Sequence, residues 1–425
     1  MAGRGSTEPL LNVRDLTTRF FTEEGRVNAV ESVDFTVRDG EVFGVVGESG
    51  SGKSVTALSV MDLVESPGEI VAGEVWYRDA DLAGEMADSH SEAVDGDSVD
   101  LRRVPSEVRR SLRGSSVSMI FQDPMSSFNP SITVGEQIAE AVEVQRRASA
   151  NPRSTRSRTQ GFGLGSMVAS TIVPTRDYVQ DESHERAIEL LDEVGIPDPE
   201  ARAEEYPHQY SGGMLQRAMV AQALAGEPDL LIADEPTTAL DVTIEAQILN
   251  LLADLQDDLG MAIVLITHDL GVIARTCDRL GVMYAGEIVE HGSLADVFDS
   301  PVHPYTQGLL GSIPDLDDPA PRLDPIEGNV PSLLAAEMDD RCYFADRCPK
   351  AMEECLDKPP SFAVDGTGVA GRTDSTGTSA TGTDGRGADT SAHTAKCYLA
   401  DHEYGQARAL PEEYFDESAD GGTDT

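Results

Sequence analysis

A glycine-rich stretch near the N-terminus has the residue types that bind phosphate groups. Residues 47–54 read GESGSGKS and fit the pattern G-x-x-x-x-G-K-[ST]. In such a loop the glycines allow backbone N–H groups to surround phosphate oxygens at the start of a helix. The Lys53 ammonium group would reach the β- and γ-phosphate oxygens, and the Ser54 hydroxyl would bind Mg²⁺. The sequence therefore predicts a nucleotide-binding loop made of Gly47, Glu48, Ser49, Gly50, Ser51, Gly52, Lys53 and Ser54.

An acidic pair later in the chain is suited to the same chemistry. Residues 230–236 read LLIADEP, so an apolar run ends in Asp234 and Glu235. At the C-terminal edge of a sheet, Asp234 would hold Mg²⁺ through water, and Glu235 would polarise an attacking water as general base. The alternative is a buried strand that ends in a solvated acidic pair. The phosphate loop favours the functional interpretation.

A second helix start has the composition of an anion site. Residues 206–224 read YPHQYSGGMLQRAMVAQAL, in which Ser-Gly-Gly opens an expected helix. The chain already has a phosphate loop of its own. We therefore interpret this second anion site as one that serves a nucleotide held by another subunit, in trans.

Four cysteines near the C-terminus form a third group of side chains that could do chemistry. Cys342, Cys348 and Cys355 lie within fourteen residues, and Cys397 follows a long tract of small and polar residues. Their spacing is not the paired C-x2-C of zinc ribbons. Four thiolates can ligate an iron–sulfur cluster or Zn²⁺, and unmetallated structural thiols are the third alternative.

The elements that must position these groups follow from apolar runs and helical patterns. Strands are expected at 41–47, 117–121, 230–234 and 262–267, each a continuous apolar run typical of a strand buried on both faces of a largely parallel sheet. Helices are expected at 53–64, 134–145, 184–194, 212–225, 243–258 and 270–276. The alternation predicts an α/β fold. Residues 123–228 interrupt it and are interpreted as an inserted helical subdomain.

Composition restricts the class of protein. The 425 residues include 76 Asp and Glu against 32 Lys and Arg, for a net charge of −44. Acid-rich, lysine-poor surfaces with a normal apolar content indicate a protein kept soluble in high salt, hence a halophilic prokaryote. The charge argues against binding to nucleic acid. No apolar run approaches the ~20 residues that span a bilayer, and no secretory signal is recognised. A cytosolic or peripheral location follows, where clustered cysteines favour metal over disulfides.

Three segments are interpreted as surface insertions. Residues 79–100 are acidic and lack periodicity. Residues 146–176 contain six arginines and no acidic residue, which suits either an acidic partner or lipid headgroups, or else a mobile insertion. Residues 364–392 are rich in Gly, Ser, Thr and Asp and are expected to form a flexible linker.

The ordered motifs resemble those of the ATP-binding subunits of ABC transporters over roughly residues 10–310. SGGM at 211–214 is similar to the signature motif of that family. Further matches are an aromatic residue ahead of the phosphate loop, the Q-loop glutamine in IFQDP, the D-loop aspartate in TALD and the switch histidine in ITHDL. These are Phe20 (with Phe21 as the alternative), Gln122, Asp241 and His268.

The resemblance implies a P-loop ATPase with a mixed sheet that works as a head-to-tail dimer. ATP would lie between the loop of Lys53 in one subunit and the signature residues of the other, Ser211, Gly212, Gly213 and Met214. Glu235 would be the general base, and His268 would contact the γ-phosphate. Gln122 would couple the nucleotide to the helical subdomain and would join Ser54 and Asp234 around Mg²⁺.

A finer resemblance is to the ATPases of oligopeptide and dipeptide importers, with nickel importers close by. This resemblance rests on residues 121–138, on residues 300–314 and on the cysteine segment, which runs from Cys342 to Cys397. Members of this subfamily have a similar cysteine motif, which in some binds a 4Fe-4S cluster; here Cys342, Cys348, Cys355 and Cys397 would be the ligands. The implied domains are an ATP-binding domain at 9–310 and a C-terminal extension at 311–425.

The implied partners are those of an importer at the cytoplasmic face of the membrane. They are two integral-membrane permeases, a second ABC ATPase subunit in a homo- or heterodimer, and an extracytoplasmic substrate-binding protein. The cargo would be di- or oligopeptides, or alternatively nickel or another small solute. A soluble non-transport ABC ATPase is disfavoured because the chain has one phosphate loop and no sustained heptads. A regulatory module without turnover is disfavoured by the presence of Glu235 and His268.

Overall fold

The computed structural model describes most of the chain as two compact units. The described residues are 9–150, 179–238, 240–312, 326–335, 338, 340–364, 370–372 and 392–401. The first unit comprises Met1–Asn12, Val37–Val42 and Val75–Ile266, and the second comprises Val13–Thr36, Phe43–Glu74 and Thr267–Thr425.

Parallel strands form the centre of the first unit. β7 (Val117–Ile120), β8 (Leu230–Asp234) and β9 (Ala262–Thr267) lie side by side, with Val117 opposite Leu230 and Leu230 opposite Ala262. Every residue in the three strands is buried, as the continuous apolar runs predicted. Because all three strands run in the same direction, the residues that follow them emerge at one edge of the sheet.

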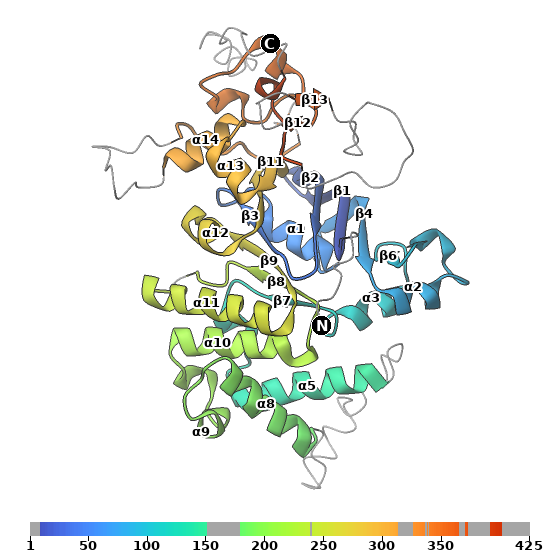
Figure 1. Ribbon diagram of the computed structural model, residues 1–425, viewed down its shortest axis with the longest axis vertical. Helices are drawn as coiled ribbons and strands as arrows, with labels where there is room; N and C mark the ends of the chain where they lie inside the picture. Colours follow the sequence, from blue (N-terminus) through green and yellow to red (C-terminus); the bar gives the residue numbers. More distant parts are fainter. Residues whose placement is uncertain are drawn as a thin grey trace. The chain divides into compact units, whose positions relative to one another are not determined.

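Helices supply much of the rest of the first unit (Figure 1). α5 (Val134–Ala150), α8 (Asp181–Glu193), α10 (Gly212–Ala223) and α11 (Val242–Leu259) confirm the helices expected near these positions. Short α4 (Pro124–Ser127) and α9 (Pro199–Ala203) accompany them. α10 packs against α5, α8 and β7. Among the helices in the described ranges, none is both long enough and apolar enough to cross a membrane.

A buried carboxylate joins α5 to α8. Glu143 is fully buried and accepts hydrogen bonds from Arg147 Nε at 2.6 Å, Ser183 Oγ at 2.8 Å and Arg146 Nη2 at 3.0 Å. Burial alone would raise the pKa of Glu143, but the hydrogen bonds from Arg146, Ser183 and Arg147 lower it to about 2. Two arginines of the segment 146–176 are therefore paired with a buried carboxylate. The others lie outside the described residues.

The acidic segment 79–100 has more structure than its lack of periodicity indicated. It contains α2 (Ala80–Met86), β5 (Val94–Asp95) and β6 (Ser98–Asp100), and β6 pairs with the end of β4 (Gly68–Arg78). With α3 (Ser106–Leu112) these elements enclose a small apolar core formed by Ala83, Met86, Ala93, Val99, Val104 and Val108. Such short elements cover too few turns to show a period in the sequence.

The second unit contains a mixed sheet. β10 (Arg279–Tyr284) runs parallel to β3 (Val42–Val46) and antiparallel to β11 (Glu287–Ser293), which confirms the mixed sheet implied by the family resemblance. β3 leads through residues 47–52 into α1 (Lys53–Val60). α12 (Leu270–Thr276) confirms the last expected helix, and α13 (Leu294–Asp299) and α14 (Pro304–Gly311) follow.

Three long strands, most of whose residues belong to the second unit, were not predicted. β1 (Leu11–Thr22) lies between β2 (Gly25–Val37) and β4. Their buried residues are interspersed with exposed ones: along β1, Leu11, Val13 and Leu16 are buried, whereas Arg14 and Asp15 are exposed. The rule of continuous apolar runs therefore overlooked them.

The C-terminal residues extend the mixed sheet. β14 (Thr394–Ala395) pairs with β11 and also with β12 (Phe362–Val364), and β12 pairs with β13 (Ala370–Arg372). β13 falls within the predicted linker 364–392, most of which lies outside the described residues. The segments that flank the linker are thus joined by strand pairing.

Candidate functional site

The predicted phosphate loop connects β3 to α1 and closes around Lys53. The Lys53 side chain is buried, and Nζ donates hydrogen bonds to the carbonyl oxygens of Gly47 at 2.8 Å and Glu48 at 2.9 Å. A buried ammonium group needs such acceptors, because leaving it unpaired would be costly. Lys53 thus lies inside the curve of its own loop, where phosphate oxygens could replace or join these carbonyls as acceptors.

Two glycines of the loop cannot be replaced without moving the backbone. A Cβ at Gly47 would lie 2.1 Å from the carbonyl oxygen of Met283. Gly52 has φ of 104° and a Cβ there would lie 2.3 Å from the carbonyl oxygen of Ala29. Ser49 and Gly50, by contrast, are exposed at the outside of the loop. Glycines of the sequence pattern are therefore required where two backbones approach closely, as well as where a ligand needs room.

The candidate general base is held by two side-chain donors. The Glu235 carboxylate oxygen Oε2 accepts hydrogen bonds from Gln122 Nε2 at 2.7 Å and Thr238 Oγ1 at 2.8 Å. Glu235 follows β8 with φ of 46°, a left-handed conformation that costs about 1–3 kcal/mol in a residue other than glycine. Its N–H donates to the carbonyl oxygen of Ile266 at 2.9 Å. The chain thus fixes both the backbone and the carboxylate of Glu235.

Of the residues around this base, Gln122 was predicted and Thr238 was not. Gln122 follows β7 and is exposed, while Asp234 is the buried last residue of β8. Thr238 belongs to the turn after Glu235, where a threonine carries no signal of its function in the sequence. The carboxylate of Asp234 and the hydroxyl of Ser54, the second residue of α1, are oxygen donors of the kind Mg²⁺ prefers.

The signature residues form the exposed start of α10. Ser211 is the N-cap, and its Oγ accepts a hydrogen bond from the Met214 N–H at 3.3 Å. Ser211 and Gly212 are exposed. A Cβ at Gly213 would lie 2.7 Å from a methyl group of Ile244, so this glycine is required by packing. Exposed N–H groups at the start of a helix are suited to bind an anion.

The remaining predicted residues lie at the ends of elements. Asp241 is the N-cap of α11 and accepts hydrogen bonds from the N–H groups of Thr243 and Ile244, both at 3.0 Å. His268 is exposed directly after β9. On β1, Phe20 is partly buried, whereas Phe21 is 49% exposed. Both aromatic residues therefore present ring surface, and the assignment of adenine stacking to Phe20 stays a prediction.

Two side chains that contact the phosphate loop were missed by sequence reasoning. The Tyr305 hydroxyl accepts a hydrogen bond from the Glu48 N–H at 2.9 Å, and Arg347 Nη1 donates to the Glu48 carboxylate at 3.2 and 3.3 Å. Both residues are far from the loop in sequence, and no motif spacing relates them to it. They come together only through the folding of the second unit.

The four C-terminal thiols share a buried region. All are free, and Cys355 and Cys397 are buried. Burial, followed by the proximity of the other thiols, raises the pKa of Cys342 to about 12 and also raises that of Cys397. Backbone groups of Phe344, Lys350, Met352 and Leu399 hydrogen-bond to the four sulfurs and oppose these shifts. Among the residues that the structure describes, no group of three or more His, Cys, Asp or Glu side chains has a metal-holding arrangement.

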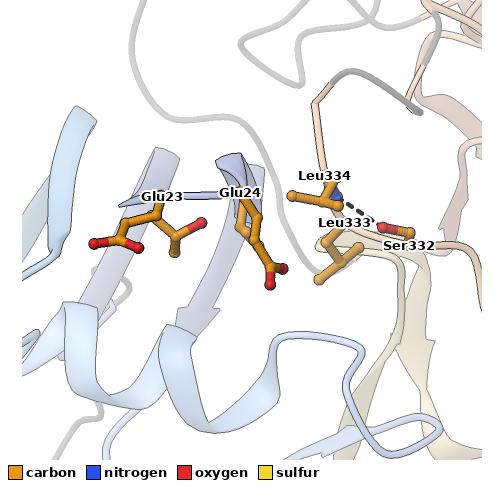
Figure 2. Close-up of a pocket in the computed structure, with 7 residues that line it drawn as sticks. Glu23, Glu24, Ser332, Leu333 and Leu334 are labelled. Atoms are coloured by element: carbon orange, nitrogen blue, oxygen red, sulfur yellow. Dashed lines mark hydrogen bonds between the residues drawn. The ribbon is translucent and has the colours of Figure 1, made fainter.

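A hollow of about 620 Å³ lies elsewhere in the second unit, between the β1–β2 turn and residues 332–334 (Figure 2). Glu23 and Glu24 lie on one side, and Ser332, Leu333 and Leu334 on the other. None of the predicted site residues lines it. Two carboxylates would repel a phosphate, so this hollow is not suited to bind the phosphates of a nucleotide.

Two known families match successive parts of the chain. Residues 30–238 match the family described as ABC transporter, and residues 289–355 match the family described as oligopeptide/dipeptide transporter, C-terminal region.

Relatives match most of the chain. A probable peptide ABC transporter ATP-binding protein of Sinorhizobium fredii is 45% identical over 362 residues, which are 85% of this chain and 93% of the relative. The dipeptide transport ATP-binding protein DppD of Escherichia coli is 42% identical over 83% of this chain and 92% of its own length. The oligopeptide transport ATP-binding protein AppD of Bacillus subtilis is 41% identical over 84% and 94%. A solved bacterial ABC transporter cassette aligns with 67% of this chain at 24% identity and a TM-score of 0.48.

The contact between Thr238 and Glu235 predicts a kinetic effect. Thr238→Val keeps the shape of the side chain but removes the hydroxyl donor, so the carboxylate is less firmly oriented toward an attacking water. We expect kcat for ATP hydrolysis to fall about tenfold, which corresponds to about 1.4 kcal/mol, with KM for ATP changed less than about twofold.

Thr238→Ser is the matched control, because it keeps the hydroxyl and loses only a methyl group. It should retain most of kcat. Wild-type kcat in Thr238→Val, measured by phosphate release at saturating ATP, would show that this hydrogen bond has no part in hydrolysis.

Proposed function

Because this chain belongs to the family of ABC transporter ATP-binding proteins, we propose that it hydrolyses ATP to power the import of di- or oligopeptides through a membrane transporter. The observation that carries the peptide assignment is the match of residues 289–355 to the C-terminal region of oligopeptide and dipeptide transporters. This match lies outside residues 30–238, which match the general ABC transporter family, so it supports one kind of transporter over another. Nickel or another small solute is the alternative cargo.

Each predicted site residue has a proposed role in hydrolysis. Lys53 and the N–H groups of residues 47–52 bind the β- and γ-phosphates, and Phe20 stacks on the adenine. Ser54, Asp234 and Gln122 would hold Mg²⁺, which would supply positive charge to neutralise the phosphates. Glu235 orients and polarises the attacking water, and its hydrogen bonds from Gln122 and Thr238 fix the direction of the carboxylate. His268 contacts the γ-phosphate.

The exposed start of α10 supports a head-to-tail dimer. Ser211 and Gly212 are open to solvent although their backbone N–H groups suit an anion. We propose that Ser211, Gly212, Gly213 and Met214 bind the nucleotide of a second ATPase subunit, with Asp241 close to the shared boundary. That subunit is either a second copy or a related ATPase. The dimer would serve two permeases and an extracytoplasmic binding protein from the cytoplasmic face of the membrane.

The domain division also belongs to this proposal. Residues 9–310 would form the ATP-binding domain, with the helical subdomain at about 123–228, and residues 311–425 would form the extension of the peptide-transporter type. The extension is the part in which the four cysteines lie.

We further propose that the four thiols bind a 4Fe-4S cluster. The donor set is chemically suitable, since four cysteines lie near one another and backbone hydrogen bonds reach their sulfurs, as around cluster thiolates. Binding would require the thiols to lose their protons and to move from the arrangement described above, which does not hold a metal. Zinc and unmetallated thiols are the alternatives.

A halophilic origin is proposed from charge. The chain has 76 acidic against 32 basic side chains. At low ionic strength the resulting repulsion destabilises the folded state, whereas at 1 M salt the Debye length falls to about 3 Å and the repulsion is screened.

The transport proposal is tested in proteoliposomes that contain the two permeases, the binding protein and this subunit. Lys53→Ala should reduce both ATP hydrolysis and uptake of labelled dipeptide to below about 1% of wild type, because the phosphate site loses its cation. Uptake of nickel but not of peptide would instead establish the alternative cargo. Unchanged hydrolysis in Lys53→Ala would overturn the site assignment.

The shared site is tested by mixing two inactive variants. In a head-to-tail homodimer, a Lys53→Ala subunit paired with a Ser211→Arg subunit retains one intact site, so random mixing should restore about a quarter of wild-type hydrolysis. If both functional groups served the same subunit's nucleotide, the mixture would stay inactive. If the dimer instead pairs this chain with a related ATPase, that ATPase replaces one of the two variant subunits in the same assay.

The cluster proposal is tested on protein purified without oxygen. It should absorb broadly near about 400 nm and contain about four iron atoms per chain. Cys397→Ser should lose this absorption, whereas Cys277→Ser, at the isolated buried cysteine, should keep it. Zinc, or no metal, in the wild-type protein would contradict the cluster.

The halophilic proposal is tested by thermal unfolding in increasing KCl. The Tm should rise by roughly 10 °C or more between 0.1 and 3 M KCl, a change of a few kcal/mol in the free energy of unfolding. Sucrose serves as the control, because it stabilises folded proteins without screening charge. A flat or falling Tm in KCl would exclude salt adaptation.

A further inference from the structure

The cysteine segment contacts the phosphate loop through one arginine. The Arg347 side chain is only 7% exposed, and its Nη1 lies 3.2 and 3.3 Å from the two carboxylate oxygens of Glu48. Glu48 is the second residue of the phosphate loop, and Arg347 immediately precedes Cys348. The C-terminal extension thus provides a positive charge to the loop in which Lys53 lies.

The guanidinium group is fixed by contacts on several sides. Nε donates to the carbonyl oxygen of Glu327 at 2.9 Å, and Nη1 lies 3.4 Å from the Tyr284 hydroxyl. The guanidinium carbon lies 5.7 Å from the ring centre of Tyr284 and 5.9 Å from that of Phe344. A planar group held by hydrogen bonds and by aromatic rings loses little further freedom when it pairs with a carboxylate.

A carboxylate in a phosphate loop presents an electrostatic problem. The loop exists to concentrate donors and positive charge on phosphate oxygens, and an ionised side chain on its second residue repels the same oxygens. The Glu48 carboxylate is partly buried, so solvent alone screens it incompletely. Arg347 supplies the missing counter-charge from the side of the extension.

The main chain at Glu48 is held by the same group of residues. Its N–H donates to the Tyr305 hydroxyl at 2.9 Å. Tyr305, Tyr284 and Phe344 pack on one another, with ring centres 4.6 Å apart for the two tyrosines and 5.5 Å apart for Tyr305 and Phe344. The aromatic cluster therefore connects the loop backbone to the residues around Arg347.

The turn that contains Arg347 is formed by backbone hydrogen bonds that involve three of the cysteines. The Ala345 N–H donates to the carbonyl oxygen of Cys342 at 3.0 Å, and the Cys348 N–H donates to that of Ala345 at 3.2 Å. The Cys342 N–H in turn donates to the carbonyl oxygen of Cys355 at 3.0 Å. Backbone hydrogen bonds therefore join these cysteines to the turn that contains Arg347.

We propose that Arg347 is a positioning residue for the phosphate loop, which neutralises Glu48 and thereby sets the affinity for ATP. The cysteine segment is then a structural part of the nucleotide site and not only an appended region. The inference rests on the proposed function of residues 47–54.

A double-mutant cycle on the full-length chain separates charge neutralisation from general structural support. Arg347→Ala leaves the Glu48 carboxylate uncompensated and should weaken binding of a fluorescent ATP analogue about tenfold. In a Glu48→Gln background the same substitution should cost less than about twofold, because no carboxylate is left to neutralise. Arg347→Lys, which keeps the charge, should recover most of the affinity.

Salt gives a second readout that a purely structural role would not change. The defect of Arg347→Ala should shrink as KCl is raised, because screening replaces the lost counter-charge. Arg341→Ala is the matched control, since Arg341 immediately precedes Cys342 and its Nη1 donates to the Asp346 carboxylate at 2.8 Å. It should bind nucleotide within about twofold of wild type.

Each outcome decides between the explanations. Equal losses from Arg347→Ala in the wild-type and Glu48→Gln backgrounds, or wild-type affinity in Arg347→Ala, would overturn the inference. Should Arg347→Ala not fold, as judged by circular dichroism, Arg347→Gln replaces it in the cycle with the same expectation. Loss of binding in Lys53→Ala together with wild-type affinity in Arg347→Ala refutes only the role of Arg347. Retained binding in Lys53→Ala refutes the phosphate loop itself.

Discussion

The ammonium group of Lys53 must find oxygen acceptors, because burial removes it from water and an unpaired buried charge is costly. Its acceptors are carbonyl oxygens of its own loop, which requires the chain to turn tightly between β3 and α1. That turn brings the backbone against Met283 and Ala29, where only glycine fits at positions 47 and 52. The packing around the phosphate loop therefore depends on the placement of one charge, and Tyr305 adds a hydrogen bond to the loop backbone at Glu48.

The two candidate centres are stabilised by different means. The phosphate loop is defined by steric contact and by a buried cation. The base Glu235 is instead held by donors on its carboxylate and by a backbone conformation that few residues other than glycine adopt. Such a conformation persists only where its surroundings enforce it, and the hydrogen bond to Ile266 contributes to that enforcement. The orientation of Glu235 thus depends on these local restraints.

Sequence reasoning predicted what short patterns encode. Continuous apolar runs identified β7, β8 and β9. Motif spacing predicted residues 47–54, Glu235 and Ser211 as site residues, and their roles stay predictions. It overlooked β1, β2 and β4, whose buried positions are mixed with exposed ones, and it overlooked the folded core within 79–100. Thr238, Tyr305 and Arg347 could not be predicted. For the last two, hydrogen bonds across 257 or 299 residues of chain arise only when the fold brings their partners together.

The pairing of β12 with β14 has a consequence for how this extension varies in length. Phe362 lies opposite Ala395 and Ala363 opposite Thr394, so the chain leaves and re-enters the extension at neighbouring points. The entropic cost of joining two paired strands by a connecting segment rises only with the logarithm of its length, about 0.6 kcal/mol for each doubling. Evolution can therefore lengthen or shorten the tract between these strands while Cys397 keeps its place beside the other three thiols. The same junction offers an engineer a site at which a reporter domain can be inserted.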